Sequence, residues 1–549
     1  MGWPRLYPIL SFWASAREMI PKGVSMSPQI WSRICLVCAL IVSGLGKVAY
    51  AESPVQGDSA KTGNRPWAEI QILDAETGRG IPLVELETVN NLVFVTDNAG
   101  RIAFQEPGLM GQEIFFTVKS HGYEMTRDGF GFPGTRFTPR AGERKVIKLK
   151  RINLAERIVR LTGEGLYRDS QLLGYETPLF KPLGAGHVSG QDSVQATVFQ
   201  DKVYWFWGDT NRMGYPLGLF RMAGATTPVP GPGFDPSIGI AFDYFVDKSG
   251  FARAMMPIPE RPEGVVWVFA LCVVPDANGK ETLCAHYTRR KGLAEEIEHG
   301  IAVFDPEKSI FIPAKTLPLK ETWRHPSGHP IPFVENGKKW LLMGSPNPNV
   351  RVPATLEAIL DPSQYEAFTC APVPSQMENG GPLAREEGKT VWRWQKNLPP
   401  TDSKTEHKLV REGKISPENA RFCPVNVSDP KERIVLHSGS VRWNPFRKKW
   451  ILLAGQIGGK SSLLGEVYYS EADAPTGPFP QATKVLTHEK QTFYNVCHHD
   501  FLDREGGRFV HFEGTYTNDF SGNPWKTPRY NYNQILYRLD LGIKSPSLK

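Results

Sequence analysis

The chain has 549 residues with a hydrophobic share of 40%, and its formal charge is +7. This length favours two domains, and the apolar share is ample for a large core. Removal of a leader over residues 1–51 would take away five basic residues and one acidic residue and leave a charge of +3, which gives no support to nucleic-acid binding.

The N-terminus has the features of an export signal. The segment 32–51 joins a basic flank, an apolar run and an Ala49-x-Ala51 ending, which predicts a signal peptide over residues 1–51, with Met26 as an alternative start. Its apolar run is too short to span a bilayer, and no later segment approaches about 20 apolar residues. We therefore expect a secreted or periplasmic protein without an integral membrane segment after cleavage.

A polar linker over residues 52–65 leads into residues 66–152, which predict a small β-sandwich. Short strand-like runs alternate there with glycine-containing turns: EIQILD, LVELETV, LVFVTD, RIAFQE, EIFFTVKS and RKVIKLKRI. The sequence TDNAGRIAF, followed by a Gly-Tyr strand, resembles the prealbumin-like (carboxypeptidase-regulatory-like) modules found beside secreted carbohydrate-active and peptidase domains. No catalytic grouping occurs in this part, so we expect a structural or docking accessory.

From residue 160 onward one hairpin theme repeats five times. The five copies are DSVQATVFQDKVYWFWGD, RAMMPIPERPEGVVWVFAL, GHPIPFVENGKKWLLMGSP, HSGSVRWNPFRKKWILLAGQ and HHDFLDREGGRFVHFEGTY. Five units of about four strands each predict a β-propeller over residues 160–549, with paired sandwiches or a β-helix as the fallback. The predicted fold class is thus all-β, a five-bladed β-propeller preceded by a small β-sandwich.

The spacing of the copies predicts long insertions between strands. The marker positions in the second strands, Phe206, Phe269, Leu342, Leu453 and Phe512, lie roughly 60 to 110 residues apart. The longest insertion covers residues 371–421 and contains Trp392 and Trp394. These two indoles form either a sugar-stacking platform or an anchor that packs the insertion onto the propeller.

Five cysteines remain after the leader: Cys272, Cys284, Cys370, Cys423 and Cys497. An odd number leaves at least one thiol free. Cys272 and Cys284 are equidistant from Asn278 in a predicted hairpin turn, so a cross-strand disulfide and two buried thiols are both open.

The first copy places two carboxylates together. If the hairpin turns at Gln200-Asp201, opposed residues have numbers that sum to 401, so that Asp192 faces Asp209. Adjacent carboxylates repel and split their pKa values, leaving an acid and a base near neutral pH. A shift of one residue in the turn would separate them, and the simpler interpretation is that Asp192 opens a strand and Asp209 ends one.

Hairpin openings should converge at one rim, because the innermost strands of a propeller all start around its central funnel. The openings are Asp192, His329, His437 to Ser440 and His498 to Asp500, and the returning strands end at Asp209, Gly344, Gly455-Gln456 and Glu513. In the fifth copy a turn centred on Gly506 predicts that His499 faces Glu513. The pattern therefore predicts a funnel lined by carboxylates and imidazoles.

Paired carboxylates are the usual groups for hydrolysis of a glycosidic bond. The predicted catalytic residues are Asp192, Asp209 and Glu513, and the predicted substrate-binding residues are His329, His499, Arg212, Tyr516 and Arg529. Further aromatic candidates for sugar stacking are Tyr215, Tyr494, Trp525 and Tyr530, of which we expect only two or three to reach a ligand. No phosphate loop, HExxH or paired-cysteine motif occurs, so no cofactor and no metal ligand are predicted, with a structural Ca²⁺ near His325, His329, His498 and His499 as the open alternative.

The first-blade Asp192 together with the GDT that contains Asp209 resembles a family of five-bladed propeller glycosidases that includes enzymes cleaving D-arabinan. More distantly it resembles family 43 glycoside hydrolases. The segments GSVRWNPFRKKW and GEVYYSEADAPTGPF are similar to exported bacterial proteins of that architecture. The resemblance implies that Asp192 and Asp209 are the funnel carboxylates; the family 43 third carboxylate has no clear counterpart, and Glu466 and Glu513 are candidates.

The sequence thus predicts an exported glycoside hydrolase that acts on a polysaccharide or oligosaccharide substrate. The alternative is a propeller without catalysis that binds a glycan or a protein partner at a cell surface.

Overall fold

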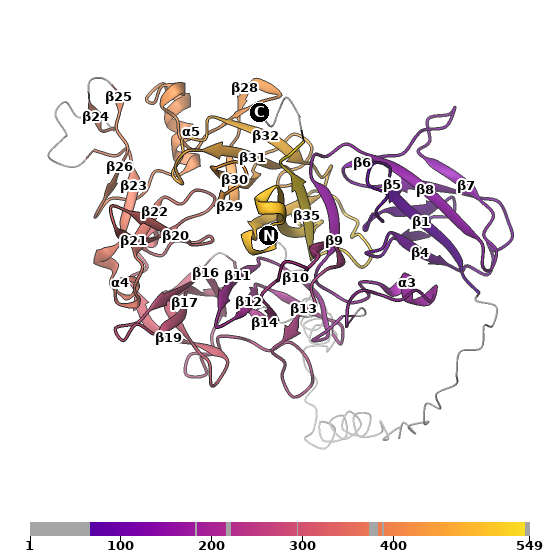
Figure 1. Ribbon diagram of the computed structural model, residues 1–549, viewed down its shortest axis with the longest axis horizontal. Coiled ribbons are helices and arrows are strands. Elements are labelled where there is room, and N and C mark those ends of the chain that lie inside the picture. Colours follow the sequence, from indigo (N-terminus) through magenta and orange to yellow (C-terminus); the bar gives the residue numbers. More distant parts are fainter. Residues whose placement is uncertain are drawn as a thin grey trace, which may run out of the picture. The chain divides into compact units, whose positions relative to one another are not determined.

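The computed structural model describes residues 66–181, 184–215, 221–293, 295–372, 383–386 and 389–543. The predicted signal peptide and linker lie outside these residues, as do parts of the 371–421 insertion. The described chain is all-β, with only short helices between the strands (Figure 1). None of its helices is both long enough and apolar enough to cross a membrane.

Two four-stranded sheets make up the N-terminal sandwich. One has the order β4-β1-β8-β6 and the other β3-β2-β5-β7. The strands are β1 (Ala68–Asp74), β2 (Glu85–Thr88), β3 (Val93–Val95), β4 (Arg101–Phe104), β5 (Ile114–Lys119), β6 (Tyr123–Glu124), β7 (Gly134–Phe137) and β8 (Arg144–Arg151). Alternate apolar side chains of both sheets, among them Ile72, Leu86 and Phe116, form one shared core. The prealbumin-like relationship stays a prediction.

Five further sheets of four or more strands follow, and Figure 1 shows them around a common centre. The first three blades are β11 (Gln195–Phe199), β12 (Lys202–Trp207), β14 (Ala223–Pro228) and β15 (Asp243–Tyr244); β16 (Val265–Pro275), β17 (Glu281–Lys291), β18 (Glu295–Asp305) and β19 (Ile310–Leu317); and β20 (Ile331–Glu335), β21 (Lys338–Met343), β22 (Val350–Pro353), β23 (Glu366–Thr369) and β26 (Arg393–Gln395). The fourth blade holds β29 (Leu436–Asn444), β30 (Lys449–Gln456), β31 (Val467–Ala472) and β32 (Gln481–Leu486), extended by β27 (Val425–Asn426) and β28 (Asp429–Arg433).

The fifth blade joins the two ends of the propeller. It consists of β33 (Thr492–His498), β34 (Phe509–Thr517) and β35 (Asn533–Asp540), and its outer strand is β9 (Glu156–Arg160) from the start of the propeller. This pairing ties the first strand to the last blade through backbone hydrogen bonds and protects that sheet edge.

Each of the five contacts between neighbouring blades has its own hydrophobic core. Strand β12 shows why the sequence runs are so apolar: Val203 and Trp205 pack towards blade five, whereas Phe206 packs towards blade two. Both faces of a blade are covered, so the usual polar side of a strand is absent. A core at all five interfaces defines a five-bladed ring.

Short elements fill the connections. They are β10 (Val188–Gln191), β13 (Thr210–Arg212), β24 (Arg385–Glu386), β25 (Lys389–Thr390), α3 (Arg168–Leu172), α4 (Leu356–Leu360), α5 (Ser403–Arg411), and 3-10 turns at Pro236–Ile238, Thr322–Arg324, Pro362–Gln364, Pro417–Asn419, Asp500–Leu502 and Glu505–Gly507. In the insertion, the indoles of Trp392 and Trp394 lie 5.7 and 5.1 Å from the Phe368 ring of blade three. The insertion is therefore anchored by these indoles, as the second of the two interpretations predicts.

The second predicted copy of the hairpin is wrong. Residues 253–264 form a connection rather than a strand, and the blade-two hairpin is β16–β17, which turns at Asp276 to Gly279. Phe269 consequently lies in an innermost strand and not in a second strand. The cause is the long β16, whose apolar run continues past the point at which the other copies turn.

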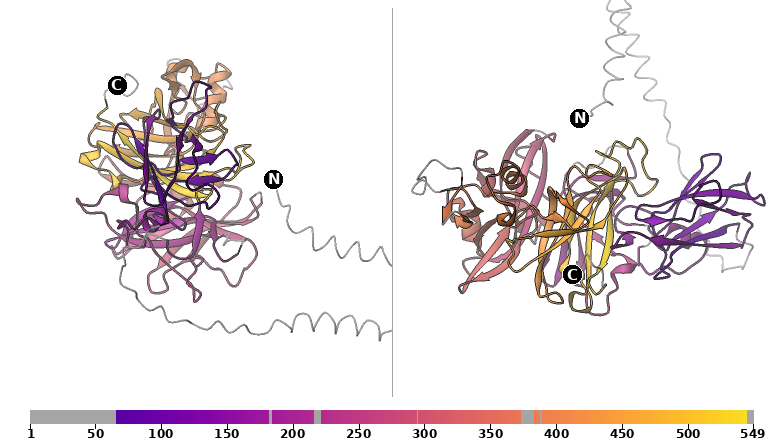
Figure 2. Two further views of the ribbon diagram at one scale, coloured as in Figure 1. Left: turned by 90° about the vertical axis from the view of Figure 1, so that its right-hand side faces the viewer. Right: turned by 90° about the horizontal axis from the view of Figure 1, so that it is seen from above.

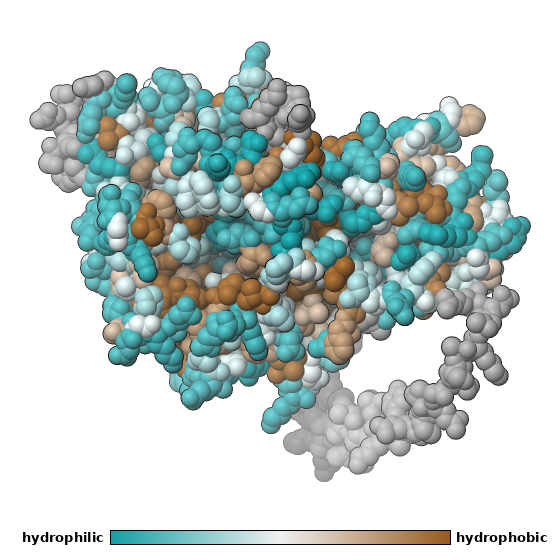
Figure 3. Space-filling view, viewed as in Figure 1, coloured by the Kyte–Doolittle hydropathy of each residue, from teal (hydrophilic) through white to brown (hydrophobic). Residues whose placement is uncertain are grey.

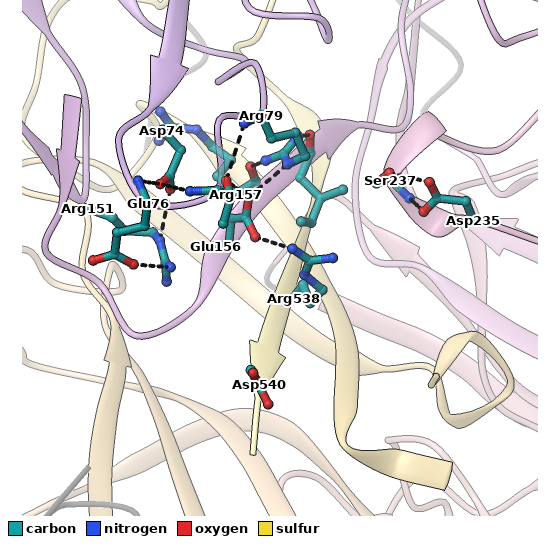
Figure 4. Close-up of polar contacts among 12 residues, drawn as sticks. Asp74, Glu76, Arg79, Arg151, Glu156, Arg157, Asp235, Ser237, Arg538 and Asp540 are labelled. Carbon is teal, nitrogen blue, oxygen red and sulfur yellow. Dashed lines mark hydrogen bonds and ion pairs between the residues drawn. The ribbon is translucent and has the colours of Figure 1, made fainter. Parts of the chain in front are cut away.

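A buried polar network joins the sandwich to β9 and β35 (Figure 4). Arg79 of the sandwich donates to Glu156 at 2.8 Å, and Arg538 donates to the other oxygen of Glu156 at 2.5 Å. The fully buried Arg157 donates to the backbone carbonyls of Pro82 and His121, both at 2.9 Å. Such a network holds its partners in one geometry, because each buried charge needs all of its hydrogen bonds.

In Figure 2 the indigo-to-purple sandwich lies beside the yellow strands of blade five. The predicted domain boundaries stay predictions.

Candidate active site in the propeller channel

The hairpin that carries the two aspartates has the predicted register. Val198 pairs with Val203 and Phe199 with Lys202, and beyond the aspartates Gln191 pairs with Thr210, again with numbers that sum to 401. The turn residues Gln200 and Asp201 have φ values of 47° and 61°, as a two-residue type I′ turn requires. The turn therefore fixes the position of Asp192 against Asp209.

The strand is interrupted at the aspartates themselves. Ser193 has a left-handed φ of 56°, and the ladder is split there into β10–β13 and β11–β12. Irregular strand segments of this kind redirect side chains next to functional sites. Here the break leaves Asp192 and Asp209 partly exposed just before the innermost strand of blade one begins, a position that we call the mouth of the propeller channel.

Asp192 is held by hydrogen-bond donors on both oxygens. Its Oδ1 accepts from the backbone N–H of Asp209 at 2.9 Å, and its Oδ2 accepts from the Tyr494 hydroxyl at 2.7 Å. Burial raises the pKa of Asp192, and the hydrogen bonds from Tyr494 and Tyr532 act in the opposite direction because they favour the carboxylate. These donors come from blade five, so the channel mouth is assembled from distant parts of the chain.

Asp209 has fewer stabilising contacts. Its Oδ1 accepts from the indole N–H of Trp267 in blade two at 2.9 Å. Burial first, and then the neighbouring charge of Asp192, raise the pKa of Asp209 to about 7, although the Trp267 hydrogen bond acts to lower it. The geometry thus gives one carboxyl that holds a proton near neutral pH beside a second carboxyl whose raised pKa is partly offset by hydrogen-bond donors.

Small polar side chains connect this mouth to blades four and five. Asn495 has a left-handed φ of 53°, donates through Nδ2 to Ser193 Oγ at 2.5 Å and donates its backbone N–H to Ser438 Oγ at 3.1 Å. The predicted convergence of hairpin openings therefore holds for Asp192 and Ser438, whereas His437 is exposed and bonds to its neighbour Ser438.

A second cluster lies within the channel wall. The Cys497 sulfur lies 3.5 Å from His329 Nδ1 and 3.8 Å from His499 Nδ1, and His499 Nε2 lies 2.6 Å from Glu513 Oε1. Cys497, His499 and Glu513 are almost completely buried. The structure thus brings together His329, His499 and Glu513 as predicted, around a cysteine that sequence reasoning did not place in the site.

The electrostatics of this cluster differ from those of the aspartates. Burial would raise the pKa of the Cys497 thiol, but the His329 and His499 imidazoles lower it well below its usual range. Burial acts to lower the pKa of His499, yet Cys497 and Glu513 outweigh it and raise that pKa to about 10. Burial raises the pKa of Glu513, and the contact with His499 offsets part of this rise. The cluster therefore favours a charged His499 imidazolium between anionic partners over a group that readily gives up a proton at neutral pH.

The register predicted for the fifth hairpin is off by two residues. Cys497, not His499, is opposite Glu513, because the connection from residue 499 to residue 508 contains two 3-10 turns instead of a tight turn at Gly506. His499 still reaches Glu513, since residues two apart on a strand share a face and the diagonal neighbour is within reach.

The remaining predicted substrate contacts lie elsewhere. Tyr516 is completely buried and its hydroxyl pairs with Thr527 at 3.0 Å, so its predicted role in sugar binding is wrong in this conformation. Arg529 is exposed next to Gly165 and interacts with Asp169. Arg212 is exposed at the rim, three residues beyond Asp209, above the Tyr215 ring. Tyr530 is buried, whereas Tyr215 and Trp525 are exposed.

A cavity of about 640 Å³ is lined by residues of the innermost strands and of their connections. Its lining includes Val198, Val273, Trp443, His329 and His499, but neither Asp192 nor Asp209. Figure 3 shows hydrophobic side chains gathered along a hollow in the middle of the propeller.

The histidines that were candidates for binding an ion do not form one cluster. His498 bonds to Asp503 at 3.0 Å, and His325 stacks on His299 in blade two at 4.2 Å. Among the described residues, Glu296, His299 and His325 present ligand atoms within 4.8 Å of one another. The aspartate site itself contains no such group among the residues that are described, and a structural Ca²⁺ stays untested.

The cysteines in the described chain are free and buried. Cys272 and Cys284 are direct cross-strand partners with their sulfurs 3.5 Å apart, which corresponds to the interpretation of two buried thiols.

The fold and the site define an all-β propeller protein with a partly buried carboxylate pair at its channel mouth. No protein-family model and no curated protein matches the sequence. Similar solved structures include an exo-β-1,3-galactanase from Phanerochaete chrysosporium, with a TM-score of 0.34 and 8% identity over 70% of this chain and 65% of that chain. They also include a family 43 β-xylosidase/α-arabinofuranosidase from a compost microbial metagenome, with a TM-score of 0.31 and 13% identity over 64% of this chain and 92% of that chain.

An exo-β-1,3-galactanase from Clostridium thermocellum is similar at a TM-score of 0.33 and 10% identity, over 69% of this chain and 62% of that chain. The chain thus spans less than two thirds of the length of either galactanase. The five-bladed fold is established by the sheets and by the cores between them.

Proposed function

We propose that the protein is an exported glycoside hydrolase in which Asp209 donates a proton to the glycosidic oxygen. Asp192 would act as the second carboxylate, either as a nucleophile at the anomeric carbon or as a base that activates water. The observation that carries the proposal is the pair itself: two carboxyl groups of unlike environment, in backbone contact, at the channel mouth.

A proton donor must be protonated at the working pH and must be able to release its proton. Asp209 meets this condition because its pKa of about 7 lies close to neutrality. A nucleophile or base must be ionised. Burial raises the pKa of Asp192, and the hydrogen bonds that it accepts from Tyr494 and Asp209 favour the carboxylate and offset part of this rise. The division of labour between two carboxylates is the pattern of glycoside hydrolysis.

The surroundings also suit a carbohydrate. The hydroxyls of Ser193 and Tyr532 and the amide of Asn495 lie around the pair. The indole N–H of Trp267 donates to Asp209. Arg212 and the exposed Tyr215 lie at the rim. A polysaccharide or oligosaccharide is therefore the proposed substrate, and Glu513 and His499 are assigned to positioning rather than to proton transfer.

The test is reducing-sugar release from arabinan, xylan, pectin and algal polysaccharides by the wild type and by Asp192→Asn and Asp209→Asn. We expect the wild type to cleave one polymer and both variants to lose at least about 100-fold in kcat while their melting curves stay cooperative, because acid–base groups contribute about 10²–10⁴-fold.

Equal cleavage by the variants would overturn the role of the pair and direct attention to Glu513 and His499. If one polymer binds and none is cleaved, the non-catalytic glycan-binding propeller becomes the better interpretation.

A further inference from the structure

A large groove lies between the sandwich and the loops of blade five. It has a volume of about 1300 Å³, and its walls come from β2, β3 and β5 on one side and from residues 489–491 and 522–528 on the other. Pockets for small ligands have volumes of roughly 300–1,000 Å³. The size therefore suits an extended ligand better than a single small molecule.

Trp525 presents a flat apolar face in this groove. Its side chain is 79% exposed, and it lies between Pro524 and Lys526 in a segment that Pro528 ends. An indole that is open to solvent offers a large, rigid apolar face, which suits the C–H face of a sugar ring.

The loop that carries Trp525 is held in place from several sides. Asn518 is fixed at the base of the loop by two hydrogen bonds. Its backbone N–H donates to Asn531 Oδ1 at 2.8 Å, and its side-chain amide donates to the Asn523 carbonyl at 3.0 Å. Asn523 in turn donates to Gln491 at 3.2 Å, and Thr527 pairs with Tyr516 at 3.0 Å. A ligand would thus meet a preformed surface and would not have to order the loop.

The sandwich wall is attached to the same loop. The Tyr530 hydroxyl donates to the Thr96 carbonyl at 2.6 Å, and Thr527 hydrogen-bonds to Glu85. The sandwich is therefore one wall of the groove.

The charges along the groove are balanced. The lining includes the acidic residues Glu85, Glu87 and Glu489 and the basic residues Lys119, Lys490 and Lys526, and Lys119 forms an ion pair with Glu87. Gln491 is buried, and its amide nitrogen has no partner among the described residues, so a ligand hydroxyl could accept from it. Balanced charge with amide donors favours a neutral glycan over an acidic one.

The loop also leads to the aspartate pair. At its end Tyr532 hydrogen-bonds to Asp192. Near its beginning Asp519 interacts electrostatically with Tyr494, the second tyrosine that donates to Asp192. The Asp519 backbone carbonyl accepts from Thr492 at 2.6 Å, directly before Phe493 and Tyr494. One segment, residues 518–532, thus borders both the groove and the site of proposed cleavage.

We propose that this groove binds a neutral glycan chain, with Trp525 as its stacking platform and the sandwich as its second wall. The assignment of the chain as substrate rests on the proposed glycoside hydrolase function, whereas the binding itself does not.

The experiment measures binding of soluble arabinan and xylan, with polygalacturonate as the acidic comparison, by affinity electrophoresis. It uses the full mature chain carrying Asp209→Asn, so that no probe is consumed. We expect Trp525→Ala to weaken binding of a neutral polymer by about tenfold or more. Trp525→Phe should retain most of the binding, because it keeps an aromatic face.

Phe520→Ala is the matched control, since Phe520 is 62% exposed in the same loop but does not line the groove. Its binding should stay within about twofold of the parent, below the loss of a hot-spot contact. The proposal is overturned if Trp525→Ala binds as the parent does, if only polygalacturonate binds, or if no polymer binds.

The two proposals can fail separately. Binding that depends on Trp525 without cleavage by the wild-type protein would remove the hydrolase and leave the glycan groove. Cleavage with polymer KM values that Trp525→Ala does not change would do the reverse.

Discussion

The channel holds two carboxylate sites that are built in opposite ways. Asp209 has another carboxylate as its neighbour, and its direct hydrogen-bond donor is the neutral indole of Trp267. Glu513 has the imidazole of His499 at 2.6 Å, and that imidazole also contacts Cys497. Asp209 is partly exposed and Glu513 is almost completely buried, and burial raises the pKa of both carboxyls. The partners act in opposite directions, because Asp192 raises the pKa of Asp209 further whereas His499 lowers that of Glu513.

The partner decides what each site can do. A carboxyl beside a like charge keeps its proton to higher pH, which makes it able to give that proton to a substrate. A carboxyl beside an imidazole gains a fixed partner, and the pair then contributes to the structure of the channel wall. Proximity of acidic residues in a funnel is therefore insufficient to assign catalysis.

The largest expected effect is on stability at the second site. His499→Ala leaves Glu513 buried without its hydrogen-bond partner and removes the ring that packs on Trp205 at 5.1 Å. Breaking one partner of a buried pair costs about 3–5 kcal/mol in the free energy of unfolding, which denaturant titration measures.

The pH dependence supplies a check on the same variant. The pKa of His499 is raised from 6.5 to about 10, so its contribution is fully present below about pH 6.5 and is lost as the pH rises through about 10. The deficit of His499→Ala should therefore be larger at pH 6 than above pH 10. A deficit under about 1 kcal/mol at pH 6 would mean that the His499–Glu513 pair is not a structural ion pair, and the contrast with the aspartate pair would be lost.

The second prediction is that a substitution at the aspartate pair stabilises the protein, whereas His499→Ala destabilises it. The pKa of Asp209 is raised from 3.8 to about 7, so the folded state binds more protons than the unfolded state between these values, and stability falls as the pH rises through that window. Asp209→Asn cannot ionise and should be more stable than the wild type at pH 8, by on the order of 2 kcal/mol, with the advantage absent near pH 4.

Melting midpoints from pH 4 to pH 8 measure this difference. Asp201→Asn is the matched control, because Asp201 is exposed at the turn of the same hairpin. A variant that loses stability at pH 8 would mean that Asp209 is a structural carboxylate, like Glu513.

Local pattern was enough to predict the first hairpin. The two-residue turn at Gln200-Asp201 fixes the register, and the register places Asp192 beside Asp209. The hairpins of blades one, three and four and most sandwich strands could likewise be read from apolar runs and turn residues, whereas the second hairpin was placed wrongly. The fifth hairpin shows the limit of this method, because two 3-10 turns replace the tight turn and no sequence rule fixes their length.

Contacts between distant segments were beyond local pattern. Tyr532, Trp267 and Cys497 reach the site from three different strands or loops, and their roles depend on the order of the blades. Strand β9 was missed for the same reason, since its partner β35 lies at the opposite end of the chain. Cys497 did carry a signal: it lies two residues before His499, on the same face of one strand.

The smallest expected effect concerns the proton on Asp209. Trp267→Phe keeps an aromatic ring but removes the indole N–H, which lies 2.9 Å from Asp209 Oδ1 and favours the ionised carboxylate. The pKa of Asp209 should therefore rise, and the alkaline limb of the pH profile of kcat should move up by about half a unit to one unit, as expected for one hydrogen bond. The control is Trp443→Phe, because the exposed indole of Trp443 lines the 640 Å³ cavity and not the aspartate pair. This variant should leave the alkaline limb in place. An unchanged limb in Trp267→Phe would mean that Asp209 is not the group whose ionisation ends activity, and a limb that moves down would reverse the roles of Asp192 and Asp209.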